Sequence, residues 1–172
     1  MKKIIFISFI FLTVIFIYKS YSDSEFVSVI GDNYYTEYQS KKNYIIYLNS
    51  GDYRIIDLKN DINNNVDIMY NTKTLKLQHV LVKSKKLIIT IGMNELNYFN
   101  TQIINNKYKY IDEVIQDYNE LFDMILLLDK EQIYFVDNSE IINNCEYKKY
   151  YQDKLHTLLD KKQIELLNFT NQ

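Results

Sequence analysis

Residues 86–95 read KLIITIGMNE, an apolar run that is closed by Gly92 and followed by polar residues. A short apolar run bounded by a turn-forming residue is typical of a strand buried on both faces. Three further runs have this form and end in Gly, Asn, Ser or Asp: FVSVI at 26–30, YIIYL at 44–48 and QIYFV at 132–136. We therefore expect four buried strands.

Amphipathic segments lie between and after these strands. Apolar residues recur at three- and four-residue spacing over 111–126, which predicts a helix with one buried face. Residues 52–63 and 72–84 are weaker helix candidates, and 157–167 is expected to form a closing helix. Strands that alternate with helices predict an α/β fold, with a mostly parallel sheet covered by helices on both faces. Ligands of such sheets bind beyond the carboxyl ends of the strands.

The composition fits one modest globular domain with a nearly neutral surface. The 172 residues include 20 Lys and Arg against 22 Asp and Glu, and 47% are apolar. This balance excludes a long disordered tail and a basic nucleic-acid binder. Cys145 is the single cysteine, which excludes an intramolecular disulfide and a Cys-rich metal site. The sequence contains no Gly-rich phosphate loop and no metal-ligand cluster, so we expect no cofactor and no metal.

The N-terminal segment has the form of an export signal or a short membrane anchor. Two lysines precede an apolar run over residues 4–18, and Lys19 opens a polar stretch. As a hydrophobic helix these fifteen residues would measure about 22 Å, less than the roughly 30 Å hydrocarbon core of a bilayer. We expect a signal peptide or N-terminal anchor at 1–22, a connector at 23–25, and a domain at 26–172. The domain is then extracytoplasmic, either membrane-anchored or secreted.

All three glycines of the chain stand at the carboxyl ends of expected strands. They are Gly31 in IGDN, Gly51 in NSGDYR and Gly92 in IGMNEL. A D-x-x-H pattern formed by Asp153 and His156 lies just before the expected closing helix. Each feature alone is common, since Gly often terminates strands.

Together, the order and spacing of these pieces resemble the SGNH (GDSL) hydrolase family from about Phe26 to the C-terminus. The similar blocks are Gly31-Asp32, Gly51 within SGDYRIIDL, Gly92-Met93-Asn94-Glu95 after the ITIG strand, and Asp153 with His156. The resemblance implies a three-layer sandwich with a small, mostly parallel, flavodoxin-like sheet between helices.

The resemblance also implies a role for each matching residue. The backbone N–H of Gly51 and the side-chain amide of Asn94 would be donors to a developing oxyanion. His156 would be the base, and Asp153 would orient it.

The decisive departure from the family is Asn33, which stands where the family has its nucleophilic serine. A carboxamide nitrogen is a poor nucleophile, and Asn33 has no hydroxyl proton for His156 to remove. Loss of such a nucleophile costs a factor of about 10⁶ in kcat. Glu95 replaces the usual Asp beside Asn94. Gly31 and Gly51 are also close in sequence, which leaves little room for a first helix between strands one and two.

Three functions follow from this pattern. The first is an exported SGNH-like protein with impaired or absent ester hydrolysis that binds an acyl ester, a lipid or a cell-surface glycan. The second is an active esterase in which His156 acts with water or another hydroxyl. The third is a membrane-tethered structural or interaction protein. In each case the N-terminal segment contacts the membrane, and nucleic acid is not a partner.

Overall fold

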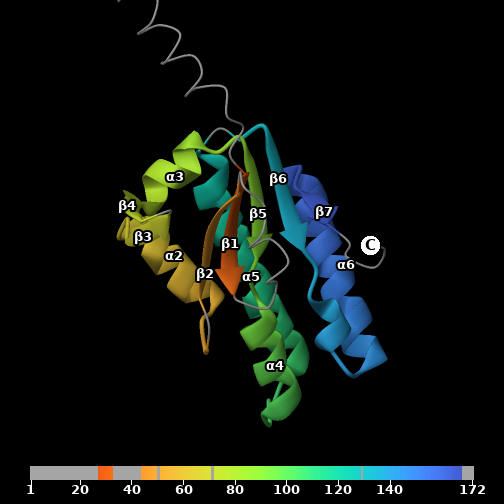
Figure 1. Ribbon diagram of the computed structural model, residues 1–172. Coiled ribbons are helices and arrows are strands. Elements are labelled where there is room, and N and C mark those ends of the chain that lie inside the picture. The colour runs from red at the N-terminus through yellow and green to blue at the C-terminus, as the bar shows by residue number, and fades with distance from the viewer. Residues whose placement is uncertain (1–26, 33–43, 50, 71, 129, 168–172) are drawn as a thin grey trace, which may run out of the picture.

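The computed structural model describes residues 27–32, 44–49, 51–70, 72–128 and 130–167 (Figure 1). Its centre is a five-stranded sheet in which every neighbouring pair of strands is parallel. In spatial order the strands are β2 (Tyr44–Asn49), β1 (Val27–Asp32), β5 (Lys86–Thr90), β6 (Gln132–Val136) and β7 (Glu165–Leu167). The four strands expected from the apolar runs are confirmed, and β7 is added to them.

The strand order shows where a ligand site would lie. Taken in chain order, the parallel strands are arranged 2-1-3-4-5, the doubly wound order of flavodoxin-like sheets. The order reverses between β1 and β5, and such sheets bind ligands at this point, beyond the carboxyl ends of the strands. We call the end of the sheet at which the parallel strands stop the carboxyl edge, and the end at which they start the amino edge.

Within the described residues, five helices connect the strands: α2 (Ile55–Asn63), α3 (Leu77–Lys83), α4 (Met93–Thr101), α5 (Lys107–Leu126) and α6 (Cys145–Lys162). The helix expected over 111–126 is confirmed within α5, and the candidate at 52–63 matches α2. A 3-10 turn, η2 (Ser139–Ile141), precedes α6.

Two helix predictions need correction. The candidate at 72–84 divides into a strand and a helix, because β4 (Lys73–Lys76) pairs with β3 (Asp67–Tyr70) in an antiparallel hairpin before α3 begins. The closing helix expected over 157–167 is wrong in its bounds. Gln163 adopts a left-handed conformation with φ 57° and ends α6, and the following residues form β7.

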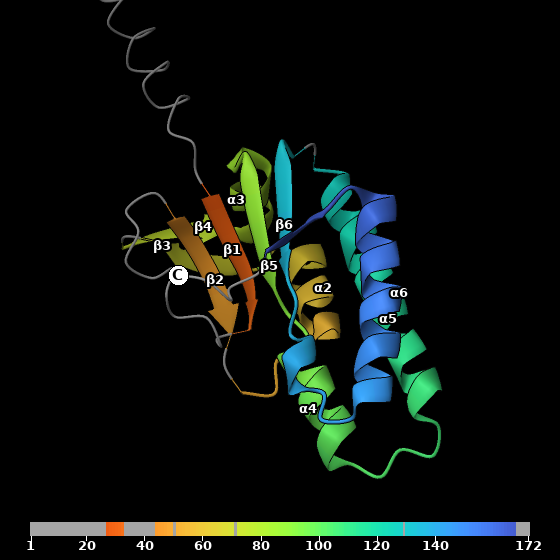
Figure 2. The ribbon, with the colours of Figure 1, turned by 90° about the vertical axis from the view of Figure 1, so that its right-hand side faces the viewer.

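The main hydrophobic core lies on one face of the sheet. All five helices contribute side chains to a cluster that includes Ile30, Leu87 and Phe135 from the sheet. Figure 2 shows α2, α5 and α6 together on this side. The alternate residues Val29, Ile88 and Val136 form a smaller cluster on the other face.

The expected three-layer sandwich is therefore not formed by the part of the chain that the structure describes, which has its helices on a single face. The physical reason is topological. The connections β2 to β5, β5 to β6 and β6 to β7 all run in one direction across the sheet, and right-handed crossovers then place their helices on one face. The β1 to β2 connection runs the opposite way, and its residues 33–43 lie outside the described ranges.

The predicted N-terminal helix also lies outside the described residues. From Val27 to Leu167, excluding the gaps stated above, no helix is long and apolar enough to cross a bilayer.

Candidate functional site

The residues of interest meet at the carboxyl edge between β1 and β5. Asp32 is the last residue of β1, and Gly92 is the N-cap residue of α4 just after β5. Asn94 and Glu95 lie in the first turn of α4. The motif that ends the ITIG strand is therefore brought beside the Gly31-Asp32 motif, at the point where doubly wound sheets bind ligands.

Gly92 is required by packing as well as by backbone conformation. Its φ is 114°, in the left-handed region that favours glycine. A Cβ at this position would lie 1.6 Å from the hydroxyl oxygen of Tyr118. That hydroxyl, buried in α5, donates a hydrogen bond to the carbonyl oxygen of Ile91 at 3.0 Å. Gly92 thus lets the start of α4 approach a buried tyrosine.

Asn94 connects the start of α4 to the loop after β2. Its Nδ2 donates to the carbonyl oxygens of Gly51 at 2.8 Å and Tyr53 at 2.7 Å. The structure therefore brings Gly51 and Asn94 together. However, a carboxamide has two N–H bonds. Both are used here by backbone carbonyls, so in this arrangement Asn94 holds the loop and has no N–H left for an oxyanion.

Asp32 is a buried carboxyl group with one unused oxygen. Its residue is 1% exposed, and its Oδ2 accepts a hydrogen bond from the backbone N–H of Met93 at 3.0 Å. Among the described residues its Oδ1 has no hydrogen-bond partner. Burial, with a smaller contribution from the nearby carboxylate of Glu95, raises the pKa of Asp32 to about 7.

Glu95 repeats this arrangement within the first turn of α4. Its Oε1 accepts from the backbone N–H of Ile55 at 2.7 Å, which ties α4 to the start of α2. Its buried Oε2 has no partner among the residues described. Burial raises the pKa of Glu95. From the sequence, Glu95 is recognisable only as a departure from the family pattern. In the structure, its side chain is one of the main links between α4 and α2 at the carboxyl edge.

The predicted acid and base are not at the carboxyl edge. Asp153 and His156 do not precede the last helix but lie inside α6, where both are exposed. The Asn144 side chain caps α6 by accepting from the backbone N–H groups of Glu146 and Tyr147, so the helix begins well before Asp153. Buried residues of α6 are Tyr151, Leu155, Leu158 and Leu159, which places His156 on the outer side of the helix.

The direction of α6 also separates His156 from Asn94. This helix starts after β6, at the carboxyl edge, and runs back to the start of β7. His156 is eleven residues beyond Cys145, which corresponds to about 16 Å along the axis. Asn33 lies outside the described residues. Of the four predicted site residues that lie within the described ranges, the structure brings together Gly51 and Asn94.

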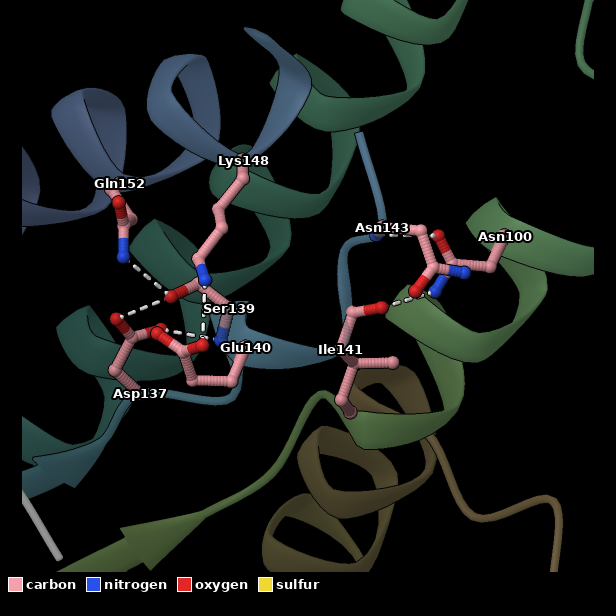
Figure 3. A network of polar contacts seen from close by, with 8 residues as sticks. All are labelled: Asn100, Asp137, Ser139, Glu140, Ile141, Asn143, Lys148 and Gln152. Atoms are coloured by element: carbon pink, nitrogen blue, oxygen red, sulfur yellow. Dashed lines mark hydrogen bonds and ion pairs between the residues drawn. The ribbon is translucent and has the colours of Figure 1, made fainter. Parts of the chain in front are cut away.

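A second polar cluster follows β6 (Figure 3). Ser139 is buried, and its hydroxyl donates to Asp137 Oδ2 at 2.8 Å and accepts from Gln152 Nε2 at 2.8 Å. Nearby, Asn100 Nδ2 donates to the carbonyl oxygen of Ile141 at 2.6 Å. No imidazole takes part in this network, and the Ser139 hydroxyl donates its hydrogen bond to the carboxylate of Asp137. The cluster therefore fixes the turn between β6 and α6 and does not resemble an activated nucleophile.

Metal binding is not indicated within the described part of the chain. There, no group of three or more His, Cys, Asp or Glu side chains could hold a metal ion.

The comparisons with known proteins concern the fold only. No protein-family model matches the chain, and no curated protein matches its sequence. Similar solved structures include the protein YxiM from Bacillus subtilis, with 13% identity and a TM-score of 0.46 over 84% of this chain. Another is LAE5, an alpha/beta hydrolase enzyme from the metagenome of Lake Arreo in Spain, with 10% identity and a TM-score of 0.43 over 84% of this chain. This chain spans 43% of the first protein and 76% of the second.

Proposed function

We propose that this chain is an exported SGNH-hydrolase-like domain that binds an acylated lipid or glycan at the carboxyl edge and does not hydrolyse it. The 2-1-3-4-5 strand order and the contact between Asn94 and Gly51 support the family assignment. The main support for a loss of hydrolysis is the position of His156, which is exposed on the outer side of α6.

Ester hydrolysis through an acyl-enzyme needs a nucleophile and a base within hydrogen-bond reach of each other. At the nucleophile position the chain has Asn33, which has no hydroxyl. The chain contains two histidines, and His79 is exposed on α3, which leads to the amino edge. Neither imidazole is therefore available to remove a proton at the carboxyl edge.

A binding role is consistent with what the carboxyl edge retains. Asp32, Asn94 and Glu95 form a fixed framework at the point where α/β sheets accept ligands. The class of ligand, an acyl ester or an acylated glycan, is the one that the family resemblance implies.

Hydrolysis is tested with p-nitrophenyl butyrate and the full chain in nanodiscs. We expect no turnover above buffer, and no gain from Asn33→Ser, because the restored hydroxyl still lacks a base. A well-folded Asn33→Ser variant with clear turnover would contradict the proposal. Turnover by the wild type that His156→Ala abolishes would show an active esterase instead.

Binding is tested by saturation-transfer NMR with ethyl butyrate and, separately, octyl glucoside. We expect saturation transfer to at least one probe, reduced by Asn94→Ala and unchanged by Asn105→Ala, an exposed asparagine in the loop before α5. The absence of transfer to both probes would remove the binding role and leave a structural or interaction protein.

A further inference from the structure

The amino edge of the sheet has a surface that the proposed ligand site does not use. Three aliphatic residues are exposed there: Val82 by 57%, Leu126 by 39% and Leu127 by 86%. They come from the end of α3 and from the end of α5 with the turn after it. Single exposed aliphatic residues are common, but a group of them on one edge indicates a contact surface.

Hydrogen bonds and an ion pair place these two segments side by side. The backbone N–H of Glu131 donates to the carbonyl oxygen of Lys85 at 3.1 Å, and Lys130 Nζ donates to the carbonyl oxygen of Ser84 at 2.6 Å. Lys85 and Glu131 also form an ion pair at 3.1 Å. The turn after α5 is therefore held against the turn between α3 and β5, and Figure 1 shows both at the same end of the sheet.

Lysines lie at the same edge as the exposed aliphatic residues. Lys83 is exposed beside Val82, and Lys161 is exposed at the end of α6, which reaches the same edge. The charge of Lys85 is paired with Glu131. Lysines at helix C-termini also complement the helix dipole, which accounts for part of this charge. The helix dipole explains only charged residues. It gives no reason for the exposure of Leu127, the most exposed of the three aliphatic residues. Aliphatic side chains among lysines are the composition of surfaces that lie in the interface of an anionic bilayer.

The chain enters the domain at this same edge. β1 begins at Val27, whose register partner on β5 is Lys86. Only residues 19–26 separate the apolar run at 4–18 from Val27. Eight residues span at most about 29 Å, so a membrane that holds the apolar run must lie close to the amino edge.

We propose that Val82, Lys83, Leu126, Leu127 and Lys161 form a docking surface for an anionic phospholipid bilayer. The aliphatic side chains enter the interfacial region, and the lysines contact the headgroup phosphates. The proposal rests on the membrane location of residues 4–18 and not on ester chemistry. It orients the carboxyl edge away from the membrane, toward ligands outside it.

The depth of single labels in the bilayer tests this orientation. The chain has one native cysteine, the exposed Cys145 at the start of α6, near the carboxyl edge. A fluorophore on Cys145 is compared with one on Leu127→Cys in a Cys145→Ser background. The full chain is placed in vesicles of phosphatidylcholine and phosphatidylglycerol that contain a lipid-attached quencher, and flotation confirms its association.

We expect strong quenching at position 127 and little at position 145. The quenching at 127 should fall with added salt, in pure phosphatidylcholine, and with Lys83→Glu, since one lysine near an anionic surface is worth about fivefold in affinity. The matched variant Lys149→Glu, an exposed lysine near the start of α6, should leave it unchanged.

Equal quenching at the two positions in chains that float with the vesicles would overturn the proposal. So would failure of the full chain to associate with vesicles, or quenching at 127 that is indifferent to lipid charge and to Lys83→Glu. None of these outcomes depends on whether the protein binds or hydrolyses an ester.

Discussion

The two edges of the central sheet organise their polar groups in opposite ways. At the carboxyl edge, Asp32, Asn94 and Glu95 turn inward and connect β1, α2, α4 and the loop after β2. At the amino edge, Lys83 and Leu127 turn outward into solvent. One edge is a fixed framework, and the other is an open surface.

Helix orientation explains the sign of charge at each edge. Carboxylates of Asp32 and Glu95 accept from backbone N–H groups at the starts of α4 and α2, where the helix dipole favours negative charge. The lysines lie near the ends of α3 and α6, where positive charge is favoured. The two edges also differ in burial, because Asp32 and Glu95 are buried whereas Leu127 is exposed. Substitutions at the carboxyl edge should therefore reduce the free energy of unfolding far more than those at the amino edge.

The largest effect is expected for Gly92→Ala. The new methyl group would have to displace the Tyr118 hydroxyl, and alanine would be held at a φ of 114°. Backbone strain and overpacking together should cost about 3–5 kcal/mol in the free energy of unfolding. Urea unfolding followed by circular dichroism measures this loss.

Two variants separate strain from packing at Gly92. Gly51→Ala has a similar left-handed backbone, with φ 84°, but no atom within 4 Å of the new Cβ, so its cost should be only about 1 kcal/mol. Tyr118→Phe removes the closest atom and should make Gly92→Ala less costly. Equal losses for the two glycine variants would show that the tyrosine contact is unimportant.

The next effect is a pH dependence that originates at Asp32. Burial raises the pKa of Asp32 in the folded protein to about 7, from an ordinary value of 3.8. The folded state therefore holds the proton more tightly than the unfolded state. The resulting stability is fully present below about pH 4 and is lost as the pH rises through 7, by on the order of 2–4 kcal/mol.

Asp32→Asn isolates this contribution, because the amide stays neutral at every pH. The difference in unfolding free energy between the wild type and Asp32→Asn should move against the wild type as the pH rises from about 4 to 8. Glu95 titrates in both proteins and cancels in the difference to first order. Parallel stability curves for the two proteins would show that Asp32 ionises in the fold without penalty.

A smaller loss is expected for Asn94→Ala. The substitution leaves the carbonyl oxygens of Gly51 and Tyr53 without the Asn94 amide, which should cost about 1–3 kcal/mol. Asn105→Ala, at an exposed position in the loop before α5, should change the stability by less than about 0.5 kcal/mol. If the two alanine variants are equally stable, Asn94 is not part of the folding framework.

Much of the fold could be predicted from the sequence because its central strands are strongly apolar. The apolar runs contain residues 27–30, 44–48, 86–90 and 132–136, which all lie in the sheet, since a run typical of a doubly buried strand leaves few alternatives. β7 was missed because its three residues continue the leucine pattern of α6. The left-handed turn at Gln163 that separates them carries no glycine signal.

The candidate site could be predicted only where its residues directly follow strands. Asn94 and Gly51 are placed by β5 and β2, so their contact follows from the parallel sheet. Asp153 and His156 have no such strand to place them, and the D-x-x-H spacing is equally compatible with a helix interior. The buried pair Asp32 and Glu95 could not be recognised from sequence, because burial of a carboxylate depends on tertiary packing.

The smallest effect on folding is expected for Leu127→Ser at the amino edge. Leu127 is 86% exposed, so little apolar burial is lost and the free energy of unfolding should change by less than about 0.5 kcal/mol. Leu121→Ser, in the same helix region but fully buried, should instead cost several kcal/mol, on the order of 3–5. A large loss at position 127 would mean that this leucine packs against the protein, and the amino edge would then be a part of the core instead of an open surface. A neutral result would show that Leu127 is not required for folding, as expected for a residue that contacts the membrane.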